Sequence, residues 1–177
     1  MTTAVRSNRP EAGEFDPYYA QYINRVPEGD ITSLLEQQIR ETGAALRALP
    51  ASRGTYRYAE GKWSIGEVIG HLTDAERIFA YRAIRIARAD KTPIEGFDEN
   101  AYVPAGEFDR RSLADLIAEF EAVRQATVTL ARGLPPASWT RIGTANGKEI
   151  SVRALIYVTA GHERHHLNTL RERYGVS

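Results

Sequence analysis

Residues 64–79 of the chain read SIGEVIGHLTDAERIF. Ser64 and Glu67 form the Ser-x-x-Glu pattern of a capping box, in which two side chains satisfy backbone amides at a helix start. Apolar side chains then recur at helical spacing, at Ile65, Val68, Ile69, Leu72, Phe79, Ala83 and Ile86. The pattern predicts an amphipathic helix that begins after Ser64 and continues to about Asp90.

Three further segments have the same apolar spacing. They are residues 30–49, the segment from Asp109 or Ser112 to Pro135, and the segment from Ser151 to about Arg173. Asn146-Gly147, just before the last segment, is typical of a tight hairpin turn between two short strands. Residues 91–108 contain two prolines and two glycines and are expected to form a long crossover loop and candidate lid. The predicted fold is all-α: a four-helix bundle with long crossover loops and a small β-hairpin before the last helix.

The first 29 residues differ from the rest of the chain. They are polar and contain several prolines, yet they carry Phe15, Tyr18, Tyr19 and Tyr22, which a free tail would not need. We therefore expect residues 1–29 to form an N-terminal arm that packs on a bundle formed by residues 30–177.

Composition excludes several classes of protein. The 177 residues include no cysteine, so a disulfide scaffold, a thiolate metal site and a cysteine nucleophile from this chain are excluded. The 23 basic residues balance the 23 acidic ones, which argues against a nucleic-acid partner. Neither a secretory signal nor an apolar stretch of membrane-spanning length is recognisable, so we expect a cytoplasmic protein without a membrane partner.

The four histidines are His71, His162, His165 and His166. On a helix, His162 and His166 lie about 40° apart on one face, whereas His165 points about 100° away from His166. His71 lies at the border of the apolar stripe of its own helix, so His71, His162 and His166 can converge if the two helices are neighbours. Three neutral imidazoles with a position left for water suit a catalytic metal site. The alternative is a half-buried polar edge with no metal.

Three motifs resemble the DinB-like family. They are residues 62–77, KWSIGEVIGHLTDAER, residues 96–102, GFDENAY, and residues 162–167, HERHHL. This family of four-helix bundles includes the YfiT-type metal-dependent hydrolases and the mycothiol- and bacillithiol-dependent S-transferases. The resemblance implies a zinc or nickel ion held by His71, His162 and His166, which match the family's histidine positions.

The resemblance also implies an enzyme with a small-molecule substrate, although no catalytic residue can be assigned. It ranks an S-transferase slightly above a hydrolase. In the first case the ion would activate an external low-molecular-weight thiol, which suits a chain without cysteine, and in the second it would activate bound water. A bundle that only binds a metal or a small ligand is the non-enzymatic alternative. A homodimer is possible in either case.

Further polar and aromatic residues have open roles. Glu163 lies on the inward face of the last helix, where it either orients a ligand histidine or pairs with an arginine. Asp74 and Arg82 are expected more often as solvated surface groups than as a base and an anion-binding group. Trp63 is expected to pack at the start of its helix, and the tyrosines of the arm to pack rather than to bind substrate.

Overall fold

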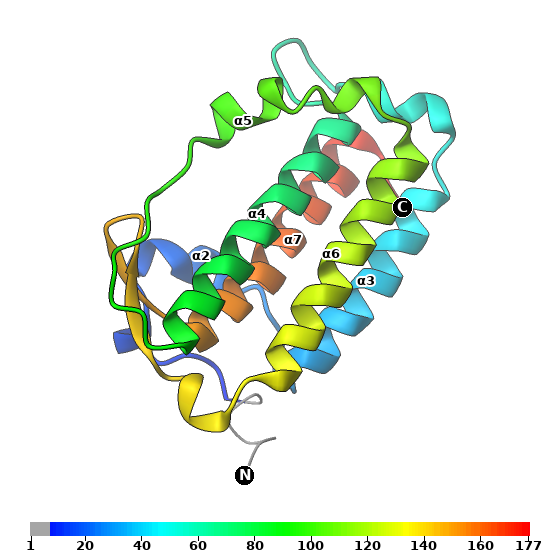
Figure 1. Ribbon diagram of the computed structural model, residues 1–177. Helices are drawn as coiled ribbons and strands as arrows, with labels where there is room; N and C mark the ends of the chain where they lie inside the picture. The colour runs from blue at the N-terminus through cyan, green and yellow to red at the C-terminus, as the bar shows by residue number, and fades with distance from the viewer. Residues whose placement is uncertain (1–7) are drawn as a thin grey trace.

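The structure is a computed structural model, and it describes residues 8–177. Four long helices form the bundle (Figure 1): α3 (Ile31–Arg47), α4 (Ile65–Ala87), α6 (Leu113–Gly133) and α7 (Val152–Tyr174). Helices α4 and α6 run in the same direction, and α3 and α7 run in the opposite one. Helix α4 lies between α6 and α7, so the predicted four-helix bundle is confirmed, with α4 and α7 as antiparallel neighbours.

Local side chains determine where the four long helices begin. Asp30, Ser64, Ser112 and Ser151 each accept a hydrogen bond from a backbone amide in the first turn of the helix that follows. At Ser64 the reciprocal bond from Glu67 is also present, so the capping box is complete. At the other end of α7, Gly175 has a φ of 68°, the left-handed conformation that commonly ends a helix.

The connection between α4 and α6 returns along the whole length of the bundle (Figure 1), because both helices start at the same end. The prediction of a long crossover loop over residues 91–108 holds for the connection but is wrong in part, since helical turns lie within it. Residues Glu99–Ala105 form the short helix α5, capped by Asp98, and Phe108–Arg110 form the 3-10 turn η4. The sequence signal was missed because Pro104 lies in the last turn of α5, where a proline reads as a helix breaker.

The predicted hairpin is confirmed. Strands β1 (Ile142–Ala145) and β2 (Lys148–Ser151) pair in antiparallel register, with Ala145 opposite Lys148. Asn146 and Gly147 form the two-residue turn, and both have positive φ angles, 53° and 71°. Ile94 of the long crossover forms a β-bridge with Ala145, and Phe15 forms one with Ile150, so the hairpin holds both segments beside the bundle.

The described part of the N-terminal segment packs on the bundle. It contains the 3-10 turns η1 (Ala12–Glu14) and η2 (Pro17–Tyr19) and the short helix α2 (Ala20–Ile23), which lies against α7. Gly161 of α7 makes this approach possible, since a Cβ atom there would lie 2.0 Å from the carbonyl oxygen of Tyr22. Residues 1–7 of the predicted arm lie outside the described residues, and the division of the chain at residue 29 stays a prediction.

The bundle interior contains two apolar clusters. One lies between the arm, the hairpin and the start of α7, and includes Ile23, Phe79 and Trp139. The other lies at the opposite end and includes Ile69, Phe108 and Phe120. None of the helices within residues 8–177 combines the length and the apolar character that a membrane crossing requires.

Candidate metal centre

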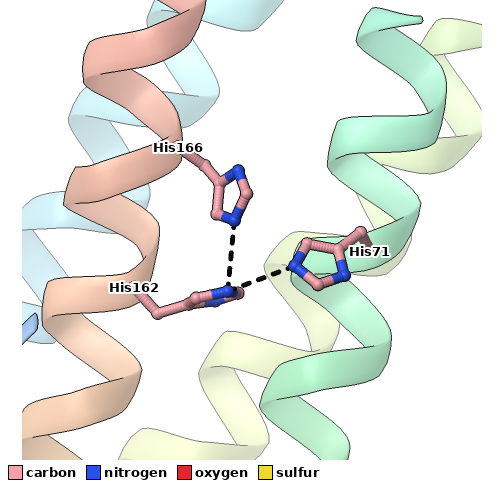
Figure 2. Close-up of side chains that lie close together, drawn as sticks. All are labelled: His71, His162 and His166. Atoms are coloured by element: carbon pink, nitrogen blue, oxygen red, sulfur yellow. Dashed lines mark hydrogen bonds between the residues drawn. The ribbon is translucent and has the colours of Figure 1, made fainter. Parts of the chain in front are cut away.

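Three histidine side chains point toward one another between α4 and α7 (Figure 2). His71 comes from the first half of α4, and His162 and His166 come from successive turns of α7. The Nε2 atom of His162 lies 3.1 Å from Nε2 of His71 and 3.2 Å from Nε2 of His166. The predicted convergence of these three residues is therefore observed, and it follows from the antiparallel packing of the two helices. His165 lies outside this cluster.

Hydrogen bonding cannot account for this arrangement. A neutral imidazole nitrogen carries either one proton or one in-plane lone pair, so Nε2 of His162 can form one hydrogen bond and has two imidazole nitrogens at that distance. Within residues 8–177, no carboxylate forms an ion pair with the three rings. A bound cation, by contrast, can accept one lone pair from each of the three rings at once.

The geometry and the donor set suit a divalent ion. Two nitrogen ligands of a tetrahedral zinc ion, each about 2.0–2.1 Å from the metal, lie about 3.3 Å apart. The two Nε2 distances of 3.1 and 3.2 Å are close to that value. One ring nitrogen from each of the three residues lies within 4.8 Å of the other two. Imidazole nitrogen is a good ligand for zinc and for nickel alike, so the donor set fits either metal.

Burial keeps the three imidazoles in the form that binds a metal. Desolvation lowers the pKa of His71 to about 4 and that of His166 to about 3. For His162, which is 7% exposed, desolvation and the three neighbouring histidines hold the pKa well below its ordinary value. All three rings are therefore neutral at pH 7, and no proton has to be displaced before a cation binds.

Aromatic side chains surround the cluster. The ring of Trp63 lies 4.9 Å from that of His71, and the rings of Tyr22 and Phe79 lie 5.4 and 5.6 Å from that of His162. Trp63 and Tyr22 thus do more than pack at a helix start or hold the arm in place, as the sequence had suggested. They form walls around the histidines and limit the access of water.

A cavity of about 240 Å³ opens beside the three histidines. Tyr18 and Tyr19 of the arm, Phe97 of the long crossover and Asn146 of the hairpin turn contribute to its lining, as does His165. The crossover predicted as a lid therefore does border the site, although a closing movement stays a prediction. Together with α4 and α7, these segments build the cavity from five parts of the chain that lie far apart in the sequence.

Glu163 belongs to a separate charged cluster in the bundle core. Arg124 of α6, which is completely buried, donates to both carboxylate oxygens of Glu76 at 2.8 Å and to Oε2 of Glu163 at 2.5 Å. Thr42 of α3 donates to the other oxygen of Glu163 at 2.6 Å. Of the two roles considered for Glu163, the structure thus shows the pairing with an arginine.

Arg124, which pairs with Glu163, and Glu76, the second carboxylate that Arg124 binds, were not predicted from the sequence. A signal was present, because Arg124 lies four residues after Phe120 and four before Val128, in the middle of the apolar stripe of its helix. The two carboxylates raise the pKa of Arg124 against the effect of its burial, so the guanidinium stays charged.

Asp74 and Arg82 have different surroundings. Asp74 is half-buried and lies 3.6 Å from Arg77 at the α4–α6 surface, and burial raises its pKa. It does not line the cavity beside the histidines. Arg82 does line this cavity and is only 3% exposed, so the expectation that it forms part of a solvated face is wrong. It was misjudged because neighbouring arginines on the same helix are exposed and the hairpin that covers this end of α4 was not placed.

Known proteins resemble this chain in sequence and in fold. A relative from Oceanobacillus iheyensis, named "Putative metal-dependent hydrolase", is 25% identical over 149 residues, which cover 82% of this chain and 75% of that protein. The solved structure of YfiT from Bacillus subtilis is described as "a probable metal-dependent hydrolase with an unusual four-helix bundle topology". It matches with a TM-score of 0.72 at 17% identity and covers 99% of this chain and 98% of its own. At that identity the match shows a common fold.

The family model of the DinB superfamily matches residues 34–170. This range includes all four long helices almost completely, the crossover, the hairpin and the three histidines of the cluster. The resemblance inferred from three short motifs is thereby confirmed: the chain belongs to the DinB superfamily and shares the fold of YfiT.

Proposed function

We propose that this protein is a metal-dependent hydrolase of small molecules in which His71, His162 and His166 bind one divalent ion, zinc or nickel. The observation that carries the proposal is the convergence of three neutral Nε2 atoms at the wall of a cavity. The names of the relative from Oceanobacillus iheyensis and of YfiT support the same reaction class. Such an ion is a Lewis acid that lowers the pKa of a bound water or thiol and polarises a carbonyl or phosphoryl oxygen.

The residues of the chain supply binding and positioning. The three imidazoles come from two packed helices, so their relative positions are fixed by the α4–α7 contact. Tyr22, Trp63 and Phe79 pack against the rings and hold water away from them, which strengthens electrostatic interactions in the site. The cavity beside the rings has room for a small molecule whose reacting group faces the histidines.

A thiol S-transferase is the second candidate. Within residues 8–177, Glu99 is the one carboxylate among the residues that line the cavity, and it is exposed. Glu163, the carboxylate adjacent to His162 in the sequence, is already bound by Arg124 and Thr42. A thiol needs less help from a general base than water does because its pKa is far lower. This observation favours an external low-molecular-weight thiol as the nucleophile.

The metal assignment is tested by elemental analysis of purified, tag-free protein after dialysis against metal-free buffer. We expect close to one zinc or nickel per chain in the wild type and strong loss in the His71→Ala, His162→Ala and His166→Ala variants. His165→Ala is the matched control, because His165 lines the same cavity without belonging to the cluster, and it should keep its metal. Wild type that stays metal-free after zinc and nickel are added back contradicts the assignment, as does equal loss in all four folded variants.

The reaction class is tested on the metal-loaded protein. A hydrolase should cleave activated aryl esters or amides without any thiol, and the His71→Ala variant should lose this activity. An S-transferase should instead consume a chloroaromatic electrophile only when a thiol such as cysteine is added. Stoichiometric metal without turnover in either screen would favour a binding module. The homodimer and the cytoplasmic location stay predictions.

A further inference from the structure

Among the residues that the structure describes, Arg82 is a buried cation without an anionic partner. Three arginine side chains within residues 8–177 are buried, Arg82, Arg124 and Arg153. Arg124 pairs with two glutamates and Arg153 pairs with Glu14. Arg82, at 3% exposed, has no ion pair with any residue in the described part of the chain. Burying a charge that is not paired is costly, so this exception requires an explanation.

The hydrogen bonds of Arg82 leave most of its donors free. One Nη2 hydrogen bond reaches the carbonyl oxygen of Glu95 at 2.9 Å, and the Nε atom is buried without a partner. The guanidinium carbon lies 6.0 Å from the centre of the Phe97 ring, which supports the side chain from the crossover. A guanidinium has five N–H donors in a planar fork that matches the oxygens of a carboxylate or a phosphate.

Arg82 lines the same cavity as the three histidines. It follows His71 by eleven positions on α4, which places both residues within about 20° on one helix face and their Cα atoms about 16 Å apart. Side chains on a helix lean toward its N-terminus, so the long arginine side chain extends from its Cα in the direction of His71. Its hydrogen bond to Glu95 and its contact with Phe97 nevertheless keep the guanidinium beside the crossover, and the side chain does not span the separation from His71, so its ligand is not the group that would face the metal.

We propose that Arg82 binds the anionic group of the molecule that enters this cavity, and that the protein therefore acts on small organic anions that carry a carboxylate or a phosphate several bonds from the reacting group. Tyr18, Tyr19 and Phe97 line the same cavity and suit an apolar or aromatic portion of such a ligand. The part of this inference that concerns the reacting group rests on the proposed function. The part that concerns the anionic group rests on Arg82 alone.

The test is calorimetric binding of benzoate, benzamide and phenyl phosphate to the zinc-loaded protein. Benzamide has nearly the shape of benzoate without its charge, so we expect wild type to prefer the anions. The Arg82→Gln substitution should weaken anion binding about 10- to 100-fold, which is the range expected for lost charge-assisted hydrogen bonds. It should leave the binding of benzamide unchanged. Arg88→Gln is the matched control, because it removes the same charge from an exposed position directly after α4 and should have no effect. The tighter of the two anions identifies carboxylate or phosphate as the group for which the site is built.

The same titration on protein stripped of metal separates this proposal from the metal assignment. If Arg82 binds the anion, the difference between wild type and Arg82→Gln persists without metal. An anion preference that disappears with the metal and is the same in both proteins would place the anion on the metal and overturn the proposal. Absence of any anion binding by wild type, or equal weakening of benzoate and benzamide, would overturn it as well.

A second variant covers the case in which Arg82→Gln does not fold. Arg82→Lys keeps the charge and loses the planar fork, so it should fold and bind benzoate less tightly than wild type does. If this variant binds benzoate as tightly as wild type, the assigned role of the guanidinium is wrong.

Discussion

Arg124 and Arg82 are both buried within the bundle, and they differ in what surrounds them. Arg124 is held by Glu76 and Glu163, and every one of its neighbours is supplied by the chain itself. Arg82 contacts one backbone carbonyl and an aromatic ring, and it lines a cavity together with three histidines. The first arginine completes a network inside the fold, whereas the second leaves donors directed at a space that a ligand can fill.

This difference separates structural from functional polar groups in the protein. A buried charge is tolerated when hydrogen bonds and opposite charges compensate for its lost hydration. Around Arg124 the compensation is internal, so this cluster needs no ligand and holds α3, α4, α6 and α7 in register. In the cavity, the ring nitrogens of the three neutral imidazoles and the charge of Arg82 have no such partner, and we assign a cation to the imidazoles and an anion to Arg82.

The largest loss of stability is expected when the buried ion-pair network of Arg124, Glu76 and Glu163 is broken. Arg124→Met leaves Glu76 and Glu163 buried without a counter-charge, and should lower the free energy of unfolding by about 3–5 kcal/mol. Denaturant unfolding followed by circular dichroism measures this loss.

A variant with Glu76→Leu and Glu163→Met in addition to Arg124→Met is the control. It removes all three charges, so most of the lost stability should return. Equal instability of the single and the triple variant would show that packing volume, and not charge compensation, explains the effect.

A smaller effect is expected from pH on the metal-free protein. The pKa of His71 is about 4 in the folded state and 6.5 in its ordinary state, so the unfolded chain takes up a proton first as pH falls. The contribution of the neutral His71 ring to the free energy of unfolding is therefore fully present above pH 6.5 and is lost as the pH falls toward 4. His71→Gln should reduce the loss of unfolding free energy between pH 7.5 and pH 5 by about 2 kcal/mol.

This pH profile is measured by denaturant unfolding at both pH values in the presence of a chelator. The variant His165→Gln is the control, since His165 is only partly buried and lies outside the cluster of three histidines. A pH profile of His71→Gln that coincides with that of wild type would mean that His71 is not buried as a neutral ring in solution.

The smallest change in stability is expected from breaking an ion pair at the surface. Arg132 and Glu36 form an ion pair with an N–O distance of 2.7 Å, and the arginine side chain is 48% exposed. Solvent screens such a pair, so Arg132→Gln should change the free energy of unfolding by less than about 1 kcal/mol. A loss as large as that of Arg124→Met would contradict the view that burial determines the contribution of an arginine in this protein.

The local features of the fold could be predicted from neighbouring residues. Ser64 and Glu67 mark the start of α4, Asn146 and Gly147 mark the hairpin, and apolar spacing marks the four long helices. Each of these signals acts through hydrogen bonds or side chains only a few positions apart, so the sequence contains the complete cause. The capping residue of helix α5, Asp98, is a local signal for a helix start. The helix was nevertheless missed, because Pro104 is typical of a loop.

The candidate site was predictable in part. The four-residue spacing of His162 and His166 requires a shared helix face, and the family resemblance adds His71. The pairing of Glu163 with Arg124 was not predictable: the apolar stripe of α6 indicated that Arg124 is buried, but no local signal reports which side chain of another helix it meets.

The sequence by itself determined the approximate limits of the four long helices and of the hairpin, the family and the choice of histidines, because these depend on short-range hydrogen bonding and on short motifs. Only the tertiary structure decided which buried polar groups find hydrogen bonds or opposite charges within the protein. Arg82 and Arg124 both lie on amphipathic helices, and their different surroundings arise from the packing of the crossover, the hairpin and the neighbouring helices. Whether a buried charge has a partner depends on contacts between distant segments, and those contacts exist only once the chain has folded.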